Sequence, residues 1–250
     1  QYLTQLHTNG KSPSSIAQVV AAVKWKTRSA AWNDIVGIIT TKTLAGIRRD
    51  GRSRGRGQVK GLTWEDVEKV CACAESTKTL AGLRDSAMMR LMSDCLLRIS
   101  ETVAVDVEDT ERVLTLWSSK TDQQGSGETL YIGDETLKVI RRYRIKGAIH
   151  SGALFRGIRR GDHITDSRLT ANSAREAIKR RTKQAGIEGF ISGHSLRVGT
   201  AISLAKTGAT VVEMQTAGRW KDSKMPAHYA RAELAERGVI ARFKYGKGRE

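Results

Sequence analysis

The sequence predicts a mainly helical protein that carries a small antiparallel β-sheet, an α+β fold. Long stretches of the 250 residues repeat apolar side chains at the three- and four-residue spacing of an amphipathic helix. Residues 103–132 instead contain short runs of the kind that form strands. Residues 48–62 are too rich in glycine and arginine to pack, so they divide the chain into two parts.

Residues 1–47 are expected to form part of a helical domain. Ser12 followed by Pro13 is typical of a helix start, and a second amphipathic segment covers about residues 32–39. Two or three helices are too few for an independent core. Because the chain also begins at Gln1 rather than at methionine, we expect a fragment or a processed product whose first domain is incomplete.

Residues 48–62 are predicted to be a flexible basic linker. Four glycines and six basic residues fall between positions 48 and 61, with almost no apolar side chain. The functional interpretation is a linker that lies along DNA, and the alternative is an ordinary solvated connector. In the first case the DNA-binding residues are Arg48, Arg49, Arg52, Arg54, Arg56 and Lys60.

Residues 63–250 are expected to form the second and larger domain. Thr63 and Asp66 have the spacing of a capping box that opens a helix. Another helix is expected over residues 79–97, and a glycine-rich hairpin loop lies around residues 125–127. Strands are predicted at residues 103–107, 113–117 and 128–132, and further helices at residues 134–146, 170–185, 195–206, 210–217, 226–230 and 232–242.

The composition points to an anionic partner. Lys and Arg number 43 against 26 Asp and Glu, and the net charge of +17 excludes an acidic solvating chain. A phosphate backbone or an anionic membrane surface attracts such a protein. Nucleic acid is favoured, because no apolar stretch is long enough to span a bilayer. The three cysteines lack metal-ligand spacing, so we predict no metal site and a reduced, cytoplasmic compartment.

Three clusters of polar residues stand in a definite order and spacing. The first ends an apolar helix with an arginine and places a carboxylate three residues later. The second is a His-x-x-Arg pair on one helical face, and the third is a Gly-x-Trp turn with a tyrosine nine residues after the tryptophan. Their members are Arg98, Glu101, His194, Arg197, Trp220 and Tyr229.

These residue types suit the cutting and resealing of a DNA strand. A tyrosine that attacks a phosphate keeps the energy of the broken bond in a covalent link. Guanidinium groups, here Arg98 and Arg197, stabilise the charge that develops on the phosphate. His194 would accept the tyrosine proton or complete the oxyanion site. Trp220 offers an indole N–H donor, or it simply packs in the core.

The choice of tyrosine depends on the spacing. Tyr131 lies in a strand pattern and Tyr143 in a helix among arginines, so packing or surface exposure explains both better. Pro226 is expected to start a helix whose first turn contains Tyr229. The assignment of Tyr229 rests on a resemblance: the nine-residue step from Trp220 to Tyr229 is the same as in a known family of DNA-cleaving proteins.

At these clusters the sequence resembles the tyrosine recombinase (phage integrase) family, from residue 63 to about residue 245. The resemblance implies that family's catalytic fold, preceded by a partial helical core-binding domain. It implies Tyr229 as the nucleophile and Lys120 as the acid that protonates the leaving 5′ oxygen. It also implies that Glu101 orients the site without donating a proton.

The resemblance further implies a site-specific DNA recombinase that forms a 3′-phosphotyrosyl link and a Holliday junction without metal or nucleotide cofactor. Its partners would be duplex DNA and three copies of itself, in a tetramer, with no membrane and no small-molecule substrate. Residues 231–243 would be a helix that docks into a neighbouring protomer or folds back on its own domain. A type IB topoisomerase-like activity and a catalytically silent DNA-binding protein are the alternatives. The expected location is the cytoplasm, with the nucleoid when DNA is bound.

Overall fold

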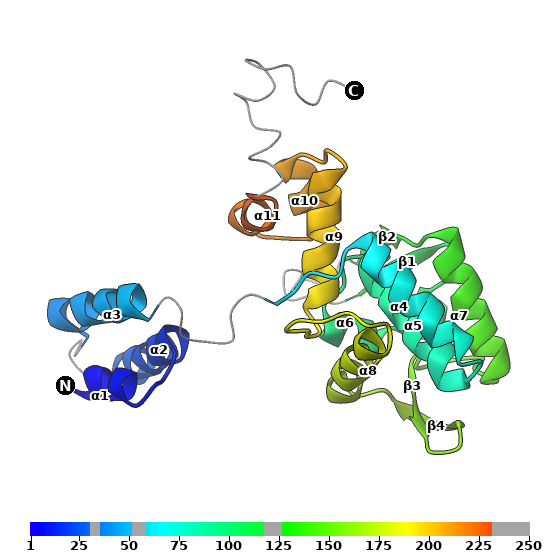
Figure 1. The fold of residues 1–250 in the computed structure, drawn as a ribbon, viewed down its shortest axis with the longest axis horizontal. Helices are drawn as coiled ribbons and strands as arrows, with labels where there is room; N and C mark the ends of the chain where they lie inside the picture. Colours follow the sequence, from blue (N-terminus) through cyan, green and yellow to red (C-terminus); the bar gives the residue numbers. More distant parts are fainter. Residues whose placement is uncertain (31–35, 52–58, 118–126, 232–250) are drawn as a thin grey trace, which may run out of the picture. The chain divides into compact units, whose positions relative to one another are not determined.

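The structure is a computed structural model that describes residues 1–30, 36–51, 59–117 and 127–231. The chain divides into two compact units, Gln1–Gln58 and Val59–Glu250 (Figure 1). Within the described residues both units are mainly helical, and the strands belong to the second unit. The predicted α+β class is confirmed.

The first unit is built from the helices α1 (Tyr2–Thr8), α2 (Pro13–Ser29) and α3 (Ile38–Asp50). The hydroxyl of Ser12 accepts the backbone N–H of Ser15 at 3.2 Å, so α2 begins with the cap that the sequence predicts. A small apolar cluster, centred on Ile16, Leu44 and Ile47, holds the helices together.

The helix α3 differs from its expected position. Part of the expected segment, residues 31–35, lies outside the described residues, and the observed helix begins only at Ile38. It then continues to Asp50, so Arg48 and Arg49 are helical rather than part of a linker. Ile47 packs in the apolar cluster of the first unit and so holds the last turn of α3 in place. Basic side chains in that turn also stabilise it, because they interact favourably with the negative end of the helix dipole.

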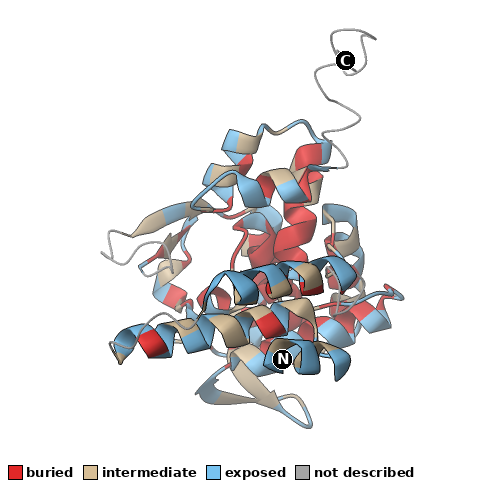
Figure 2. Ribbon diagram, turned by 90° about the vertical axis from the view of Figure 1, so that its left-hand side faces the viewer, coloured by how far each residue is buried: buried red, intermediate tan, exposed pale blue. Residues whose placement is uncertain are grey.

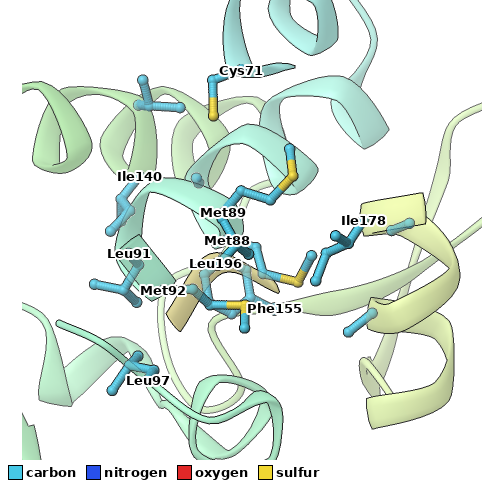
Figure 3. Close-up of a cluster of buried hydrophobic side chains, with 14 of the residues drawn as sticks. Cys71, Met88, Met89, Leu91, Met92, Leu97, Ile140, Phe155, Ile178 and Leu196 are labelled. Atoms are coloured by element: carbon cyan, nitrogen blue, oxygen red, sulfur yellow. The ribbon is translucent and has the colours of Figure 1, made fainter. Parts of the chain in front are cut away.

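In the second unit the helices pack around α5. This helix contacts α4, α7, α8 and α9, and most of its residues are buried, as are most residues of α9 (red in Figure 2). The apolar core includes Met88, Leu91, Phe155 and Leu196 (Figure 3). The helices are α4 (Trp64–Ser76), α5 (Leu80–Asp94), α6 (Ile99–Ala104), α7 (Asp134–Lys146), α8 (Ala171–Gln184), α9 (Ser195–Lys206), α10 (Val211–Ala217) and α11 (Lys224–Tyr229).

Two antiparallel hairpins accompany these helices. The strands β1 (Val113–Leu116) and β2 (Glu128–Tyr131) pair as the sequence predicts, with Val113 opposite Tyr131. The second hairpin, β3 (Arg156–Arg159) and β4 (His163–Arg168), is absent from the sequence prediction. Its strands are mostly polar and have no fully buried face, so the sequence has no alternation of apolar residues that would predict them.

The predicted strand at residues 103–107 is wrong. The helix α6 runs through Ala104, and a short 3₁₀ turn, η1, covers Val107–Asp109. β-branched residues favoured a strand in this stretch. The carboxylate of Glu101 instead accepts the backbone N–H of Arg98 at 2.9 Å and so fixes the start of a helix.

The chain enters the second unit along α9. The backbone N–H of Lys60 donates to the carbonyl of Phe190, and that of Leu62 donates to the carbonyl of Ser195, both at 2.9 Å. A Cβ added to Gly199 would lie 1.7 Å from the carbonyl oxygen of Leu62. Residues 59–62, expected to belong to the flexible linker, are therefore packed against the second unit. None of the described helices has the length and apolar character needed to cross a lipid bilayer.

Candidate active site

Arg98 lies in the turn between α5 and α6, where a buried carboxylate holds it. Leu96 has a positive φ of 45°, and this sharp turn brings Arg98 to the start of α6. The Arg98 guanidinium donates from Nη1 to Oε1 of Glu101 at 2.5 Å. The side chain of Glu101 is only 5% exposed, whereas that of Arg98 is 27% exposed. Glu101 thus holds the Arg98 guanidinium on one side, and the other side is accessible.

Arg197 projects from the first turn of α9 into the interior and is 1% exposed. Its guanidinium donates to the carbonyl oxygens of Leu96 and Gly218, and its Cζ lies 4.5 Å from the ring centroid of Trp220. Burial, aided by the nearby charges of Arg98 and Arg219, lowers the pKa of Arg197 to about 10. The group is still a cation at neutral pH.

Tyr229 and His194 meet across the unit. Oη of Tyr229 lies 3.0 Å from Nε2 of His194, which is the residue that precedes α9. Tyr229 is buried, and it is the last residue of α11 rather than a residue of the first turn. The helix starts at Lys224, two residues before Pro226. The proline is tolerated there because the first N–H groups of a helix have no partner within the helix.

Both members of this pair are uncharged at neutral pH. Burial lowers the pKa of His194 below its ordinary value, and the positive charges of Arg197 and Arg98 lower it further. Burial raises the pKa of Tyr229, although the charge of Arg197 opposes this rise. A neutral imidazole at hydrogen-bond distance from a neutral phenol can accept the phenol's proton.

Trp220 lies beside both Tyr229 and Arg197. Its ring centroid lies 6.0 Å from that of Tyr229, and the two planes are tilted by 48°. A Cβ added to Gly218 would lie 1.9 Å from the indole ring, so the glycine is needed for the ring to pack there. Trp220 therefore packs against its neighbours as well as lying beside the tyrosine.

Residues 60–236 match the phage integrase family. The chain belongs to this family.

Curated phage integrase family members give matches at modest identity. The integrase/recombinase XerD homologue of Selenomonas ruminantium is 30% identical over 198 residues, which is 74% of this chain and 58% of that protein. The recombinase Cre of Escherichia phage P1 is 24% identical over 219 residues, 79% of this chain and 64% of its own length. The chain therefore spans less than two thirds of either relative.

Solved structures of integrases and recombinases share the fold. The Tn1549 transposon integrase in complex with transposon right end DNA has a TM-score of 0.68 at 15% identity, covering 94% of this chain and 83% of that one. The crystal structure of XerA recombinase has a TM-score of 0.59 at 14% identity, covering 100% of this chain and 90% of that one. The integrase catalytic fold expected from the sequence is confirmed.

The integrase fold brings together six of the seven residues predicted to be catalytic. Arg98 and Glu101 come from the start of α6, and His194 and Arg197 from the start of α9. Trp220 follows α10, and Tyr229 is the last residue of α11. The seventh, Lys120, lies outside the described residues. Among the described residues no group of three or more His, Cys, Asp or Glu side chains could hold a metal ion.

The predicted DNA-binding residues divide differently. Arg52, Arg54 and Arg56 lie outside the described residues. Arg48 and Arg49 are in the last turn of α3, and Lys60 is an exposed residue of the second unit. Arg219 is not among the residues predicted to be functional, although it lies inside the Gly-x-Trp turn. Its burial and its ion pairs depend on distant parts of the chain, and no local pattern announces them.

Proposed function

We propose that this chain is the catalytic part of a site-specific DNA recombinase, with Tyr229 as the nucleophile. The observation that carries the proposal is the 3.0 Å contact between Tyr229 Oη and His194 Nε2 beside two arginines. A buried tyrosine next to a neutral base and a cationic site is arranged for attack on a phosphodiester.

The proposed cleavage is a transesterification. The phenol oxygen attacks phosphorus while its proton passes to Nε2 of His194. The bond from phosphorus to the 5′ oxygen breaks, which leaves a 3′-phosphotyrosyl link and a free 5′ hydroxyl. Because one ester replaces another, the step needs neither metal nor nucleotide to supply energy. The proton for the leaving oxygen would come from Lys120.

Arg98 and Arg197 would stabilise the charge of the phosphorane. Arg98 is partly exposed and its Glu101 contact occupies only one edge of the guanidinium, so N–H groups stay available for phosphate oxygens. Arg197 would act mainly through its positive charge, because its two terminal nitrogens already donate hydrogen bonds to backbone carbonyls. Trp220 would add an indole N–H donor.

We propose duplex DNA as the partner and a tetramer with a Holliday-junction intermediate as the working assembly. The net charge of +17 supports binding to phosphates. The structural relatives include a lambda integrase dimer bound to a core site, which also supports a multimer on DNA. In this proposal residues 1–47 belong to a DNA-binding domain, the basic residues from Arg48 to Lys60 contact the backbone, and residues 231–243 dock into a neighbour.

A covalent-adduct assay tests the nucleophile. The chain is incubated with a library of nicked duplexes whose sequence is randomised around the nick, because loss of the short strand beyond the nick traps the cleaved state. We expect covalent protein–DNA adducts for the wild type and none for Tyr229→Phe. Tyr131→Phe is the matched control, since this exposed tyrosine lies on β2, and it should form adducts at the wild-type rate.

A second assay uses duplexes recovered from those adducts. Exchange of strands between paired sites supports a recombinase, whereas relaxation of a supercoiled plasmid without exchange supports a topoisomerase. Binding of duplex without any adduct across the library would contradict the proposal that this chain cleaves DNA.

A further inference from the structure

Arg219 is a buried arginine in a backbone conformation that favours glycine. It has a positive φ of 53° and is 7% exposed. It follows Gly218 at the end of α10, where Arg219 N–H donates to the carbonyl of Thr216 at 3.0 Å and closes the turn. Left-handed backbone is costly for a residue with a side chain, and so is a buried cation. Interactions of the side chain must offset both costs.

The guanidinium of Arg219 contacts four acceptors. Nη2 donates to Oε2 of Glu101 at 2.8 Å, and Nη1 donates to the carbonyl of Cys95 at 3.2 Å. Nη2 also approaches the carbonyl of Leu96 at 3.5 Å. Nε lies 3.4 Å from Oε2 of Glu128, an ion pair without the geometry of a hydrogen bond.

One of these contacts, the bond to Glu101, bears on the position of Arg98. Glu101 uses Oε1 for the Arg98 guanidinium at 2.5 Å and shares Oε2 between the Arg98 backbone N–H and Arg219. With Arg219 present, the carboxylate is held from both sides and cannot rotate without losing a charged contact. Arg219 thereby acts on Arg98 through Glu101.

The contacts to the turn act on the same arginine through the backbone. The carbonyls of Cys95 and Leu96 belong to the turn that immediately precedes Arg98, and that turn is itself in a left-handed conformation at Leu96. Arg197 also donates to the carbonyl of Leu96. The turn is thus tied to two buried arginines, one on α9 and one beside Trp220.

The ion pair with Glu128 reaches a different part of the unit. Glu128 is the first residue of β2, directly after the segment that contains Lys120. Arg219 therefore connects the start of β2 with Glu101 and with the turn before Arg98. The Arg219 side chain is only 3% exposed, so it is placed to support other groups rather than to touch phosphate.

We propose that Arg219 is a positioning residue of the cleavage site: it locks Glu101 and the Cys95–Leu96 turn so that the Arg98 guanidinium meets the scissile phosphate in a fixed orientation. The inference rests on the proposed function, because the orientation matters only if Arg98 binds a reacting phosphate. A displacement of about 1 Å in such a group can reduce a rate by on the order of a hundredfold.

The test separates DNA binding from cleavage in the full chain. Duplexes recovered from wild-type adducts serve as the probe, and both the Kd for DNA and the rate of adduct formation at saturating DNA are measured. We expect Arg219→Met to slow adduct formation by about tenfold to a hundredfold with little change in Kd. Arg219→Lys should recover part of the rate, because it restores the charge beside Glu101 but has one donor nitrogen in place of the planar guanidinium that reaches both Glu101 and Cys95.

A double-mutant cycle distinguishes positioning from a loss of general packing. Because part of the effect of Arg219 passes through Glu101, Arg219→Met should slow a Glu101→Gln background less than it slows the wild type, whereas fully independent effects would multiply. Arg84→Met is the matched control: it removes another buried arginine, which pairs with Asp85 away from the site, and should leave the rate per folded molecule unchanged.

Two results would overturn the inference. One is adduct formation by Arg219→Met at the wild-type rate per folded molecule. The other is multiplication of the Arg219 and Glu101 effects. A wild-type chain that forms no adduct at all would instead remove the proposed function, and the inference with it, so the two failures have different signatures.

Discussion

At the scale of single residues, the structure places Tyr229, the proposed nucleophile, beside His194, its proposed base. Tyr229, like any phenol, is protonated at neutral pH, and burial raises its pKa further, so the proposed reaction needs a proton acceptor. His194 lies 3.0 Å from the phenol oxygen and is uncharged, because burial and two neighbouring arginines lower its pKa. The positive charges of Arg197 and Arg98, which would attract a phosphate, thus also keep the proposed base His194 unprotonated.

This arrangement predicts an acid limit for cleavage. Adduct formation needs neutral His194, so its rate should be constant at neutral pH and fall as the pH decreases through the histidine's pKa. Since that pKa is lowered from the ordinary 6.5, the fall should begin below pH 6.5. Single-turnover rates across pH measure the limit. In His194→Gln the rate should drop by on the order of a hundredfold and lose this acid dependence.

Folding must be followed in the same pH series. The unfolded chain binds a proton on His194 more readily than the folded chain does, so the linked stability is complete above pH 6.5 and decreases as the pH falls. Circular dichroism at each pH separates unfolding from loss of chemistry. An acid limit that persists in His194→Gln at equal folded fraction would contradict the role of His194 as base.

How far the site could be predicted also differs from residue to residue. The order and spacing of Arg98, His194, Arg197 and Tyr229 identified them, and the structure brings them close together, while their catalytic roles stay predictions. Arg219 could not be found this way. The proposed role of Arg219 depends on its positive φ and on contacts such as that with Glu101, more than a hundred residues away in the sequence, which only the folded chain reveals.

At the scale of elements, a buried carboxylate joins α5 to α8. Asp85 is fully buried and receives Arg84 at 2.7 Å, Arg181 at 2.8 Å and Arg180 at 3.0 Å. Arg84 lies beside it on α5, while the other two come from α8. Because two of these arginines are themselves buried, the carboxylate compensates charges that water cannot reach.

Asp85→Asn should therefore destabilise the second unit strongly. Removal of one member of a buried ion network costs about 3–5 kcal/mol, because the remaining charges lose their counter-ion. Urea unfolding followed by circular dichroism measures the change. Glu176→Gln is the control: it removes an exposed pair with Lys179 on α8 and should cost less than about 1 kcal/mol. A similar small loss for Asp85→Asn would show that the network contributes little.

Elements with strong periodicity or clear caps were predictable, and elements set by distant contacts were not. The helices α4, α7 and α9 begin within a residue of their predicted starts, since caps and apolar spacing are local signals. The segment 103–107 failed because β-branched residues resemble a strand, while Glu101 caps a helix in front of it. The hairpin of β3 and β4 carries little apolar signal.

At the scale of the whole molecule, the chain contains the tyrosine and its base within one unit. Cleavage should therefore occur within a single chain, with each copy using its own Tyr229. Mixing Tyr229→Phe with Arg98→Ala should yield no more adduct than either variant alone, measured on the recovered duplexes. Restored adduct in the mixture would mean that one copy donates its tyrosine to the arginines of another.

Family membership was the most predictable property of the whole chain. A set of ordered clusters across more than a hundred residues carries far more information than any one motif, and the match over residues 60–236 agrees with it. The boundary before this region was less accurate. Arginine and glycine marked a linker, but α3 extends into it from one side and Val59–Leu62 packs against α9 from the other.

The packing of Val59–Leu62 against α9 determines which part of the second unit would receive a pulling force on the chain. Lys60 and Leu62 are fastened by backbone hydrogen bonds to residues on both sides of His194, and the carbonyl of Leu62 lies against Gly199. Because Leu62 and Leu196 also belong to the apolar core, a force applied to the chain at Val59 would act on the first turns of α9 and on that core together. Val59–Leu62 is therefore attached to the second unit next to His194, the proposed base, and to the helix that contains the buried Arg197.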